Sequence, residues 1–422
     1  MISIEQIRNN VENVRKQLSL KGDTSSIDNI VSLDESYRSH ISKSNELRAK
    51  RNKDSEQIGL AKKLGKNADK EMQAMRQVGD EIKSIEQKAN EIKNELDALL
   101  LVLPNLPHKS TPVGKDNTEN KLIREWGEEI NKNFELKTHL ELGNALGLFD
   151  FEAAAKISGS GFPLYKDKGA KLERALINYM LDHQTKTYGY REIFPPFMVR
   201  DSSPLTTGNL PKFSDDMYHI ENDDLWMIPT AEVPITNLHQ DEILSDEDLP
   251  LKYAAYSACF RREAGSHGKE TKGLLRLHQF NKVELVQFVK PESSYDALEE
   301  LTLHAESILQ SLGLKYRVME LCTGDLSFAA AKCYDLELWA PAEEKWLEVS
   351  SCSNFESFQA RRGKIRYRKS KDGNVEFVHT LNGSGVATPR LLVSLIETYQ
   401  NSDGSISIPE PLQPYIGLEV IN

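Results

Sequence analysis

The sequence has 422 residues and a formal net charge of −11, from 53 Lys and Arg against 64 Asp and Glu. This length predicts two or three domains, and 39% hydrophobic with 28% charged residues is typical of a globular chain. The longest apolar run, 98–103, is far too short to span a membrane, and the first residues lack the pattern of a signal peptide. We therefore expect a cytoplasmic protein that makes no membrane contact.

The four cysteines form no CxxC pair, which excludes a disulfide framework and the familiar cysteine spacings of zinc sites. The acidic balance means that any nucleic-acid-binding surface has to be local, because such surfaces are usually basic.

The first 20 residues carry apolar side chains at alternating steps of three and four. This spacing places them on one face of a helix and predicts a single short amphipathic helix. The apolar positions are Ile4, Ile7, Val11, Val14 and Leu18.

Residues 27–103 have the composition of a coiled coil, with no proline before Pro104. Their second half follows a heptad pattern, while the first half has a weaker one. A turn-like stretch at 62–67 separates the halves. We therefore expect two antiparallel helices of about 35 residues each, forming a long hairpin. The heptad positions are Ile82, Ile85, Ala89, Ile92, Leu96, Leu99 and Leu103.

Basic residues gather at the predicted tip of this hairpin, between 48 and 66, where only Asp54 and Glu56 are acidic. From the residues alone, two interpretations stay open: a solvated helix face, or a surface that contacts a phosphate backbone. The basic residues are Arg48, Lys50, Arg51, Lys53, Lys62, Lys63 and Lys66.

Prolines at 104, 107 and 112 mark a linker over 104–115. Beyond it, from 116 to 422, short β-rich runs alternate with helical ones, and we expect an α+β domain. This region has no GxxxxGK[ST], GxGxxG or HExxH motif, so any ATP site uses another architecture.

Three stretches of the second half carry the chemistry. A long amphipathic helix begins near Gly169 and leads into a strand that ends at Pro195–Pro196. Residues 258–288 predict a β-hairpin with a Gly- and Lys-rich loop, which suits a polyphosphate. Residues 380–397 place small residues before a helix that bears Arg390, and an arginine there needs an anion, either a ligand or a core carboxylate.

In this order, the stretches resemble motifs 1, 2 and 3 of class II aminoacyl-tRNA synthetases. Phe260–Glu263 matches the Phe-Arg-x-Glu string of motif 2. The strings TAEVP (230–234), HQF (278–280), EVSSCSN (348–354) and NGSG (382–385) resemble those of bacterial-type seryl-tRNA synthetases. The N-terminal hairpin is similar to the tRNA-binding arm of that family, so the resemblance covers essentially the whole chain.

The resemblance implies a serine–tRNA ligase with an N-terminal tRNA-binding domain (1–103, its coiled-coil arm at about 27–103) and a class II catalytic domain (116–422). The catalytic domain would be an antiparallel β-sheet flanked by helices. The expected substrates are L-serine, ATP, tRNA-Ser and tRNA-Sec, with Mg²⁺ and no zinc. A homodimer would form through the motif 1 region, and the basic tip residues would contact tRNA.

The resemblance also implies site residues. Serine would be bound by Thr230, Ala231, Glu232, Arg261, Glu284, Asn382 and Ser384. ATP would be contacted by Arg261, Arg262, Glu263, Phe280, Glu348, Val349, Ser350, Ser351 and Arg390. Magnesium would be ligated by Glu348 and Ser351.

The sequence departs from the family pattern at three places. Arg262 stands where serine is usual, and strand alternation predicts that it points away from Arg261 and Glu263. Thr388–Pro389 replaces smaller residues before Arg390, but proline suits the first turn of a helix. Gly161 stands where we expect an arginine, which implies a missing local contact.

Three alternatives share these residues in part. An amino-acid:carrier-protein ligase would keep the activation residues but lack the helical arm. A seryl-tRNA synthetase paralog with a specialised or resistance role would look almost the same. A catalytically inactive coiled-coil protein would have no need for the motif residues together.

Overall fold

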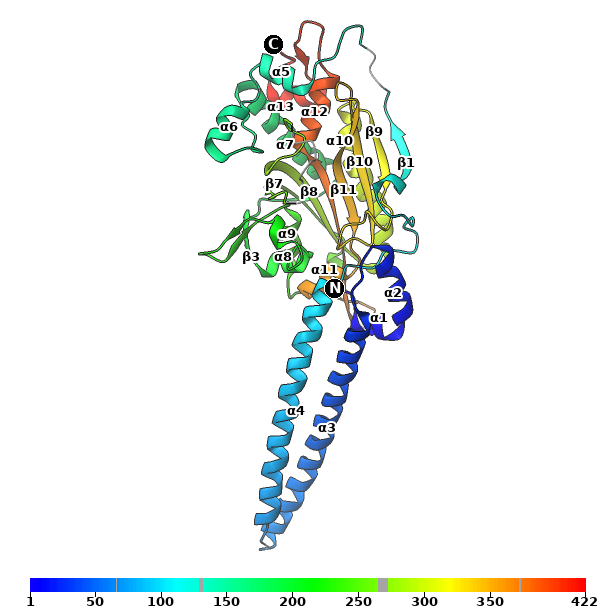
Figure 1. Ribbon diagram of the computed structural model, residues 1–422, viewed down its shortest axis with the longest axis vertical. Helices are drawn as coiled ribbons and strands as arrows, with labels where there is room; N and C mark the ends of the chain where they lie inside the picture. Colours follow the sequence, from blue (N-terminus) through cyan, green and yellow to red (C-terminus); the bar gives the residue numbers. More distant parts are fainter. Residues whose placement is uncertain (66, 129–131, 265–271, 372) are drawn as a thin grey trace. The chain divides into compact units, whose positions relative to one another are not determined.

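The computed structural model describes residues 1–65, 67–128, 132–264, 272–371 and 373–422. These residues form two compact units. The first contains Ile2–Ser19 and Asp23–Pro104, and the second contains Met1, Leu20–Gly22 and Asn105–Asn422. The first is helical and the second is built on a large β-sheet with helices (Figure 1), which confirms the predicted fold class. In the described part of the chain, no helix is both long and apolar enough to cross a membrane.

The first unit begins with two short helices where one was predicted. Asn10 leaves the helical conformation (φ −152°, ψ 58°) and separates them, so the expectation of a single helix over 1–20 was wrong. The predicted apolar face is nevertheless retained, since Ile7, Val14 and Leu18 are buried. The helices are α1 (Ile4–Asn9) and α2 (Val11–Leu20).

The hairpin consists of α3 (Ile27–Lys63) and α4 (Asp69–Val102), with 37 and 34 residues. On α4 the heptad positions Ile82, Ile85, Ala89 and Leu96 are buried as predicted. The hydrophobic pattern of α3 is weaker because two of its four buried residues are polar. These four residues are Ile27, Ile30, Asp34 and Ser44.

Both polar positions in the α3 seam have partners. The Asp34 carboxylate accepts hydrogen bonds from Arg8 (2.8 Å) and Arg38 (3.0 Å), and the Ser44 hydroxyl donates to Glu86 (2.6 Å). A buried polar group costs little stability when it is paired in this way. Hydrophobic periodicity alone therefore gives too weak a helix signal for this half of the hairpin, because it does not count paired polar residues in the seam.

The second unit contains an eight-stranded sheet. Neighbouring strands are antiparallel, except for β2 and β7, which pair in parallel. In Figure 1, strands of different colours lie side by side, because several neighbours in the sheet come from distant parts of the sequence. In spatial order they are β1 (Lys121–Trp126), β9 (Tyr316–Glu320), β10 (Lys332–Ala340), β11 (Lys345–Asn354), β14 (His379–Ala387), β8 (Gln279–Val289), β7 (Leu251–Phe260) and β2 (Arg191–Ile193).

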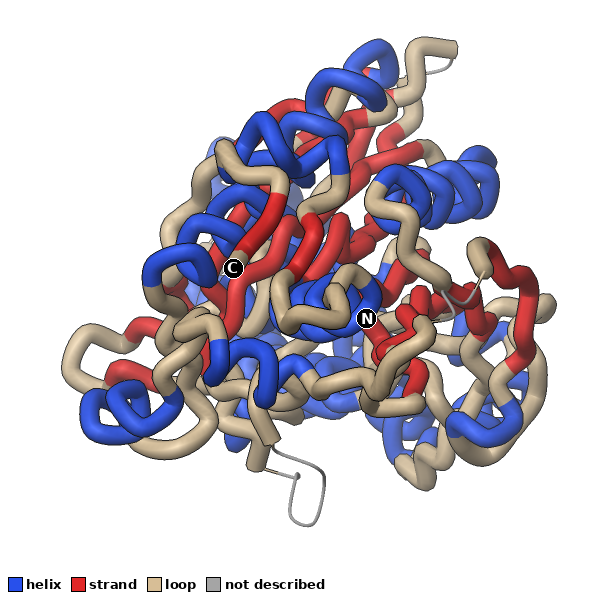
Figure 2. The backbone as a smooth tube through the Cα atoms, turned by 90° about the horizontal axis from the view of Figure 1, so that it is seen from above, coloured by secondary structure: helices blue, strands red, loops and turns tan. Residues whose placement is uncertain are grey.

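Three long helices pack on this sheet, and Figure 2 shows helices lying against the strands. The buried side chains of these helices join those of the strands in one hydrophobic core. These are α7 (Asp167–Tyr188), α10 (Ser294–Ser311) and α12 (Thr388–Thr398). Helix α7 ends at Gly189, whose φ of 69° suits a residue without a side chain. The shorter helices are α5 (His139–Ala145), α6 (Phe151–Ser158), α8 (Ser202–Thr207), α9 (Glu232–Thr236), α11 (Phe358–Gly363) and α13 (Gln413–Ile416).

Small sheets complete the unit. They comprise β3 (Met198–Arg200), β5 (Leu225–Met227) and β4 (His219–Ile220); β13 (Val375–Phe377), β12 (Arg366–Arg368) and β6 (Ile243–Ser245); and β15 (Ile406–Ser407) with β16 (Val420–Ile421).

Strand β14 shows how the sheet separates core from site. A Cβ atom at Gly383 would lie 3.2 Å from Leu301 of α10, so this position faces the helix. Side chains of a strand alternate between its faces. Asn382 and Ser384 therefore project to the opposite face, where a large cavity lies.

Candidate functional site

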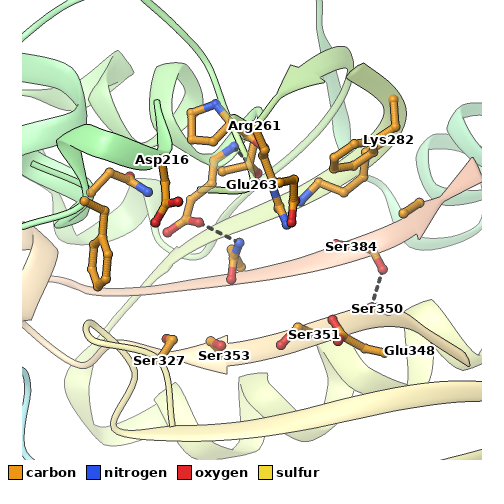
Figure 3. A pocket seen from close by; sticks show the side chains of 18 of the residues that line it. Asp216, Arg261, Glu263, Lys282, Ser327, Glu348, Ser350, Ser351, Ser353 and Ser384 are labelled. Atoms are coloured by element: carbon orange, nitrogen blue, oxygen red, sulfur yellow. Dashed lines mark hydrogen bonds between the residues drawn. The ribbon is translucent and has the colours of Figure 1, made fainter. Parts of the chain in front are cut away.

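A cavity of about 790 Å³ lies on the second unit over β8, β11, β14 and the first turn of α12, beside the segment that follows β7 (Leu251–Phe260). Figure 3 shows Arg261 and Lys282 on one side and Glu348 and Ser351 on the strand across from them. The predicted site residues that line it are Thr230, Glu232, Arg261, Glu263, Phe280, Glu348, Val349, Ser350, Ser351, Asn382, Ser384 and Arg390.

Three predicted site residues do not line the cavity. Ala231 and Glu284 are fully buried, and Glu284 lies directly behind the lining residue Thr230, whose hydroxyl donates to it at 2.6 Å. Arg262 is exposed. Its expected orientation rested on strand alternation, but β7 ends at Phe260, so that reason was wrong. Instead, the Arg262 backbone N–H donates to the Asp216 carbonyl at 2.9 Å.

One end of the cavity is lined by the carboxylate of Glu232, with the buried carboxylate of Glu284 behind the lining residues. Glu232 accepts hydrogen bonds from Gln359 Nε2 (2.6 Å) and Asn382 Nδ2 (3.0 Å). Asn382 also donates to Glu284 (3.0 Å), which forms an ion pair with Lys282. Burial and the neighbouring charge of Glu284 raise the pKa of Glu232 to about 7. This end therefore suits a small ligand with an ammonium group and a polar side chain.

The middle of the cavity presents Arg261 and Phe280. The Arg261 guanidinium lies 5.1 Å from the centre of the Phe280 ring, and its Nε donates to the Pro229 carbonyl (3.3 Å). Glu263 accepts a hydrogen bond from Arg276 Nε at 2.5 Å. A guanidinium fork suits carboxylate or phosphate oxygens, and an aromatic face suits a planar base.

Strand β11 contains a bulge that brings oxygen ligands together. Leu336 pairs with Ser350 and Glu337 pairs with Glu348, which leaves Val349 as the extra residue. The extra residue reverses the alternation, so Glu348 faces the same side as Ser351. The Ser351 hydroxyl donates to Asp335 (2.6 Å), whose pKa is raised by burial and by the charge of Glu348. A carboxylate and a hydroxyl are oxygen ligands of the kind that Mg²⁺ accepts.

Arg390 stands in the first turn of α12, which begins at Thr388 and accommodates Pro389 in that turn as predicted. Its Nε donates to the Leu275 carbonyl (3.2 Å) and its Nη1 to the Glu348 carbonyl (2.8 Å). These two hydrogen bonds orient the guanidinium at the cavity wall, where it can meet an anion.

Gly161 occupies a tight position beside the cavity strand β8. Its φ is 80°, and a Cβ atom there would lie 2.5 Å from His278 Cδ2. Its carbonyl accepts a hydrogen bond from the His278 N–H (2.7 Å). The arginine expected at this place would require a different local backbone.

Another cluster of metal-ligating residue types lies away from the cavity: His139, Glu343 and Glu397 have ligand atoms within 4.8 Å of one another. His139 Nε2 accepts the Leu274 N–H (3.4 Å), so in the neutral ring Nδ1 carries the proton and faces both carboxylates (3.3 and 3.4 Å). Hydrogen bonding accounts for the cluster.

The hairpin tip presents most of the predicted basic residues to solvent: Lys50, Lys53, Lys62 and Lys63 are exposed. Arg51 is half-buried, and Arg48 forms an ion pair with Glu86 across the hairpin (2.7 Å). Lys66 lies outside the described residues.

Comparison with known proteins identifies the family. The model of the seryl-tRNA synthetase N-terminal domain matches residues 1–107, and that of the tRNA synthetase class II core domain (G, H, P, S and T) matches residues 213–399. The serine–tRNA ligase of Geobacillus kaustophilus is 52% identical over 99% of both chains. The chain belongs to the seryl-tRNA synthetase family. The serine–tRNA ligase of Chlorobaculum parvum is 51% identical over the full length of both chains.

Solved structures of the family agree with the fold. Seryl-tRNA synthetase from Pyrococcus horikoshii, complexed with ATP, is 38% identical and superposes with a TM-score of 0.95 over 100% of this chain and 99% of that one. The cytoplasmic enzyme from Naegleria fowleri, in complex with AMP, is 28% identical with a TM-score of 0.90 over the same shares. The family is a class II aminoacyl-tRNA synthetase family, as the sequence motifs indicated.

Four residues at the site escaped the sequence analysis: Lys282, Arg276, Asp335 and Gln359. Lys282 lies between Phe280 and Glu284 on β8, and the period of two could have revealed it. Gln359 is 127 residues away from Glu232 in the sequence, so no spacing pattern connects them.

Proposed function

We propose that this protein activates L-serine with ATP to seryl-adenylate and transfers the serine to the 3′ end of tRNA-Ser. The observation that supports this most directly is the single cavity in which Glu232, Arg261, Glu348, Asn382 and Arg390 meet. The names of the relatives from Geobacillus kaustophilus and Chlorobaculum parvum, both serine–tRNA ligases, and the ATP bound to the Pyrococcus neighbour support the same reaction.

The activation step requires positioning more than a base. The serine carboxylate is already a nucleophile, and it attacks the α-phosphate of ATP in line with the leaving pyrophosphate. Arg261 would bind the carboxylate and the α-phosphate, and Arg390 would bind the γ-phosphate. Phe280 would stack on adenine, and Glu263 would accept a hydrogen bond from the adenine amino group.

Serine selection would depend on the two carboxylates. Glu232, with Thr230 beside it, would bind the α-ammonium group. Glu284, Asn382 and Ser384 would recognise the hydroxyl. Alanine and glycine would leave these buried polar groups unpaired, and sites of this kind discriminate by about 10⁴-fold.

Glu348 and Ser351 would hold Mg²⁺, since the bulge in β11 directs both side chains to one side. The ion would neutralise charge on the ATP phosphates.

Transfer to tRNA would use the helical arm, whose exposed lysines suit a phosphate backbone. The protein would act as a homodimer through the motif 1 region, and it would also serylate tRNA-Sec where that tRNA exists.

The test is serine-dependent ATP–pyrophosphate exchange, followed by ATP-dependent attachment of labelled serine to unfractionated bacterial tRNA, both with the full chain. We expect exchange with serine but little with alanine, glycine or threonine, and attachment to tRNA. Exchange without attachment would contradict the proposal and favour an amino-acid:carrier-protein ligase. Absence of serine-dependent exchange would contradict both.

A further inference from the structure

Both oxygens of the Glu232 carboxylate are held by side-chain amides. Gln359 Nε2 donates to Oε1 (2.6 Å), and Asn382 Nδ2 donates to Oε2 (3.0 Å). Asn382 lines the cavity and also contacts Glu284, whereas Gln359 is fully buried on α11 and does not line the cavity. Gln359 therefore reaches Glu232 from behind.

The hydrogen bonds around Gln359 permit only one orientation of its amide. Its Oε1 accepts from the Thr380 hydroxyl (2.7 Å), and its Nε2 also donates to the Thr207 carbonyl (3.3 Å). A flipped amide would turn its oxygen towards two acceptors, the Glu232 carboxylate and the Thr207 carbonyl. Thr380 is fully buried on β14, two residues before Asn382, and the structure shows no contact between it and Glu232.

The charges around Glu232 make its ionisation sensitive to the hydrogen bond from Gln359. Glu284 on β8 opposes ionisation of Glu232, as burial does, while Lys282 on the same strand and Arg261 beyond β7 favour it. The amide of Gln359 adds a donor that stabilises the ionised form. Without that donor, the carboxylate would be protonated more readily and would be held at one oxygen only, by Asn382.

We propose that Gln359 and Thr380 act as a relay of positioning residues: Thr380 fixes the amide of Gln359, which holds the Glu232 carboxylate in the ionised, cavity-facing arrangement that binds the α-ammonium group of the amino-acid substrate. This inference rests on the proposed function, because it assigns Glu232 to the ammonium group. It places part of the control of amino-acid affinity in two residues that never touch the substrate.

The test measures serine-dependent ATP–pyrophosphate exchange by the full chain and by three variants. Gln359→Met removes the donor to Glu232 at similar side-chain volume. Thr380→Val removes the hydroxyl that fixes the orientation of the Gln359 amide. Thr236→Val is the matched control: Thr236 is fully buried four residues after Glu232, and its hydroxyl has no hydrogen-bond partner among the described residues.

For Gln359→Met we expect the KM for serine to rise about 10- to 100-fold, the range for a hydrogen bond to a charged group, with the KM for ATP and the kcat nearly unchanged. The pH of half-maximal kcat/KM for serine should also rise, because the Glu232 pKa increases when a donor is lost. Thr380→Val should raise the KM for serine about 5-fold. Thr380→Ser should restore it, and Thr236→Val should leave it unchanged.

Equal changes in the KM values for serine and ATP, or an unchanged pH profile, would overturn the relay and indicate a merely structural role. If Gln359→Met does not fold, as judged by its thermal transition, the comparison of Thr380→Val with Thr380→Ser and Thr236→Val decides the question. A wild-type protein without serine-dependent exchange would instead refute the proposed function, so the two failures are distinguishable.

Discussion

At the scale of single residues, the site depends on carboxylates whose surroundings differ. Glu284 is close enough to disfavour ionisation of Glu232, and amide donors and Lys282 offset this effect. The residue types at these positions were predictable from sequence strings. The contacts that decide the ionisation of Glu232 were not, because they come from α11, β8 and β14.

The raised pKa of Glu232 leads to a prediction about pH. The ammonium group of serine needs the ionised carboxylate, and this form is lost as the pH falls through about 7. We therefore expect kcat/KM for serine to be half-maximal near pH 7 and to decrease below it, since this ratio reports groups of the free enzyme. In Glu232→Gln it should fall by roughly 100-fold and become flat over this range. A wild-type profile that is flat between pH 6 and 8 would contradict this assignment.

At the scale of elements, the segment that leads into β8 is held at three consecutive residues. The Leu274 N–H donates to His139 Nε2 (3.4 Å), the Leu275 carbonyl accepts from Arg390 Nε (3.2 Å), and Arg276 pairs with Glu263 (2.5 Å). The second of these contacts connects the segment to the motif 3 helix, while the first reaches α5 and the third stays within motif 2. Together, the three contacts keep one wall of the cavity in place.

Breaking one of these contacts should weaken ATP binding selectively. In Arg276→Met, Glu263 loses its guanidinium partner, and we expect the KM for ATP in the exchange reaction to rise about 10-fold while that for serine stays unchanged. Arg317→Met is a matched control, because Arg317 pairs with Glu337 at the same distance of 2.5 Å outside the cavity. Equal effects of both substitutions would show that the contact with Glu263 has no specific role.

The helical arm permits a separate prediction. Reversing two exposed charges at the tip, Lys62→Glu with Lys63→Glu, should reduce kcat/KM for tRNA roughly 10-fold through lost phosphate contacts. Serine-dependent exchange without tRNA should not change. The control is Lys83→Glu with Lys88→Glu, which alters the same number of exposed charges farther along α4. If the control pair has the same effect, net charge and not the tip determines tRNA binding.

At the scale of the whole molecule, the motif 1 region carries an exposed apolar surface. Phe194 is 75% exposed, although it packs against Phe197 and Tyr256 on one side. It also lines a second cavity, of about 470 Å³, between α7 and the β2 region. A large exposed aromatic side chain beside a cavity is typical of the centre of an interface, and this agrees with the proposed homodimer.

Phe194→Lys should therefore yield a protein that sediments as a monomer of 47.8 kDa, while the wild type sediments at twice this mass. Burying an unpaired ammonium group in the interface is costly. Ile157→Lys changes a residue that is 73% exposed elsewhere and should leave the dimer intact. A wild-type monomer in sedimentation equilibrium would contradict the proposed assembly.

Elements with strong local signals were predictable from the amino-acid order alone: the helical hairpin, the two strands of motif 2, and the helix that begins at Thr388. Most of the predicted Gly- and Lys-rich loop between those strands, 265–271, lies outside the described residues. Their signals are periodicity and turn chemistry, which act between near neighbours in the chain. The break at Asn10 was missed, because the apolar face continues across it.

Tertiary structure alone decided how the site is completed. The bulge at Val349 turns Glu348 to the side of Ser351, and Gln359 meets Glu232 only after α11 packs beside β14. Such contacts depend on register and on pairing between residues far apart in the sequence, which no local pattern records. The amino-acid order thus determined which side chains are available, and the packing of the sheet determined which oxygens and amides meet.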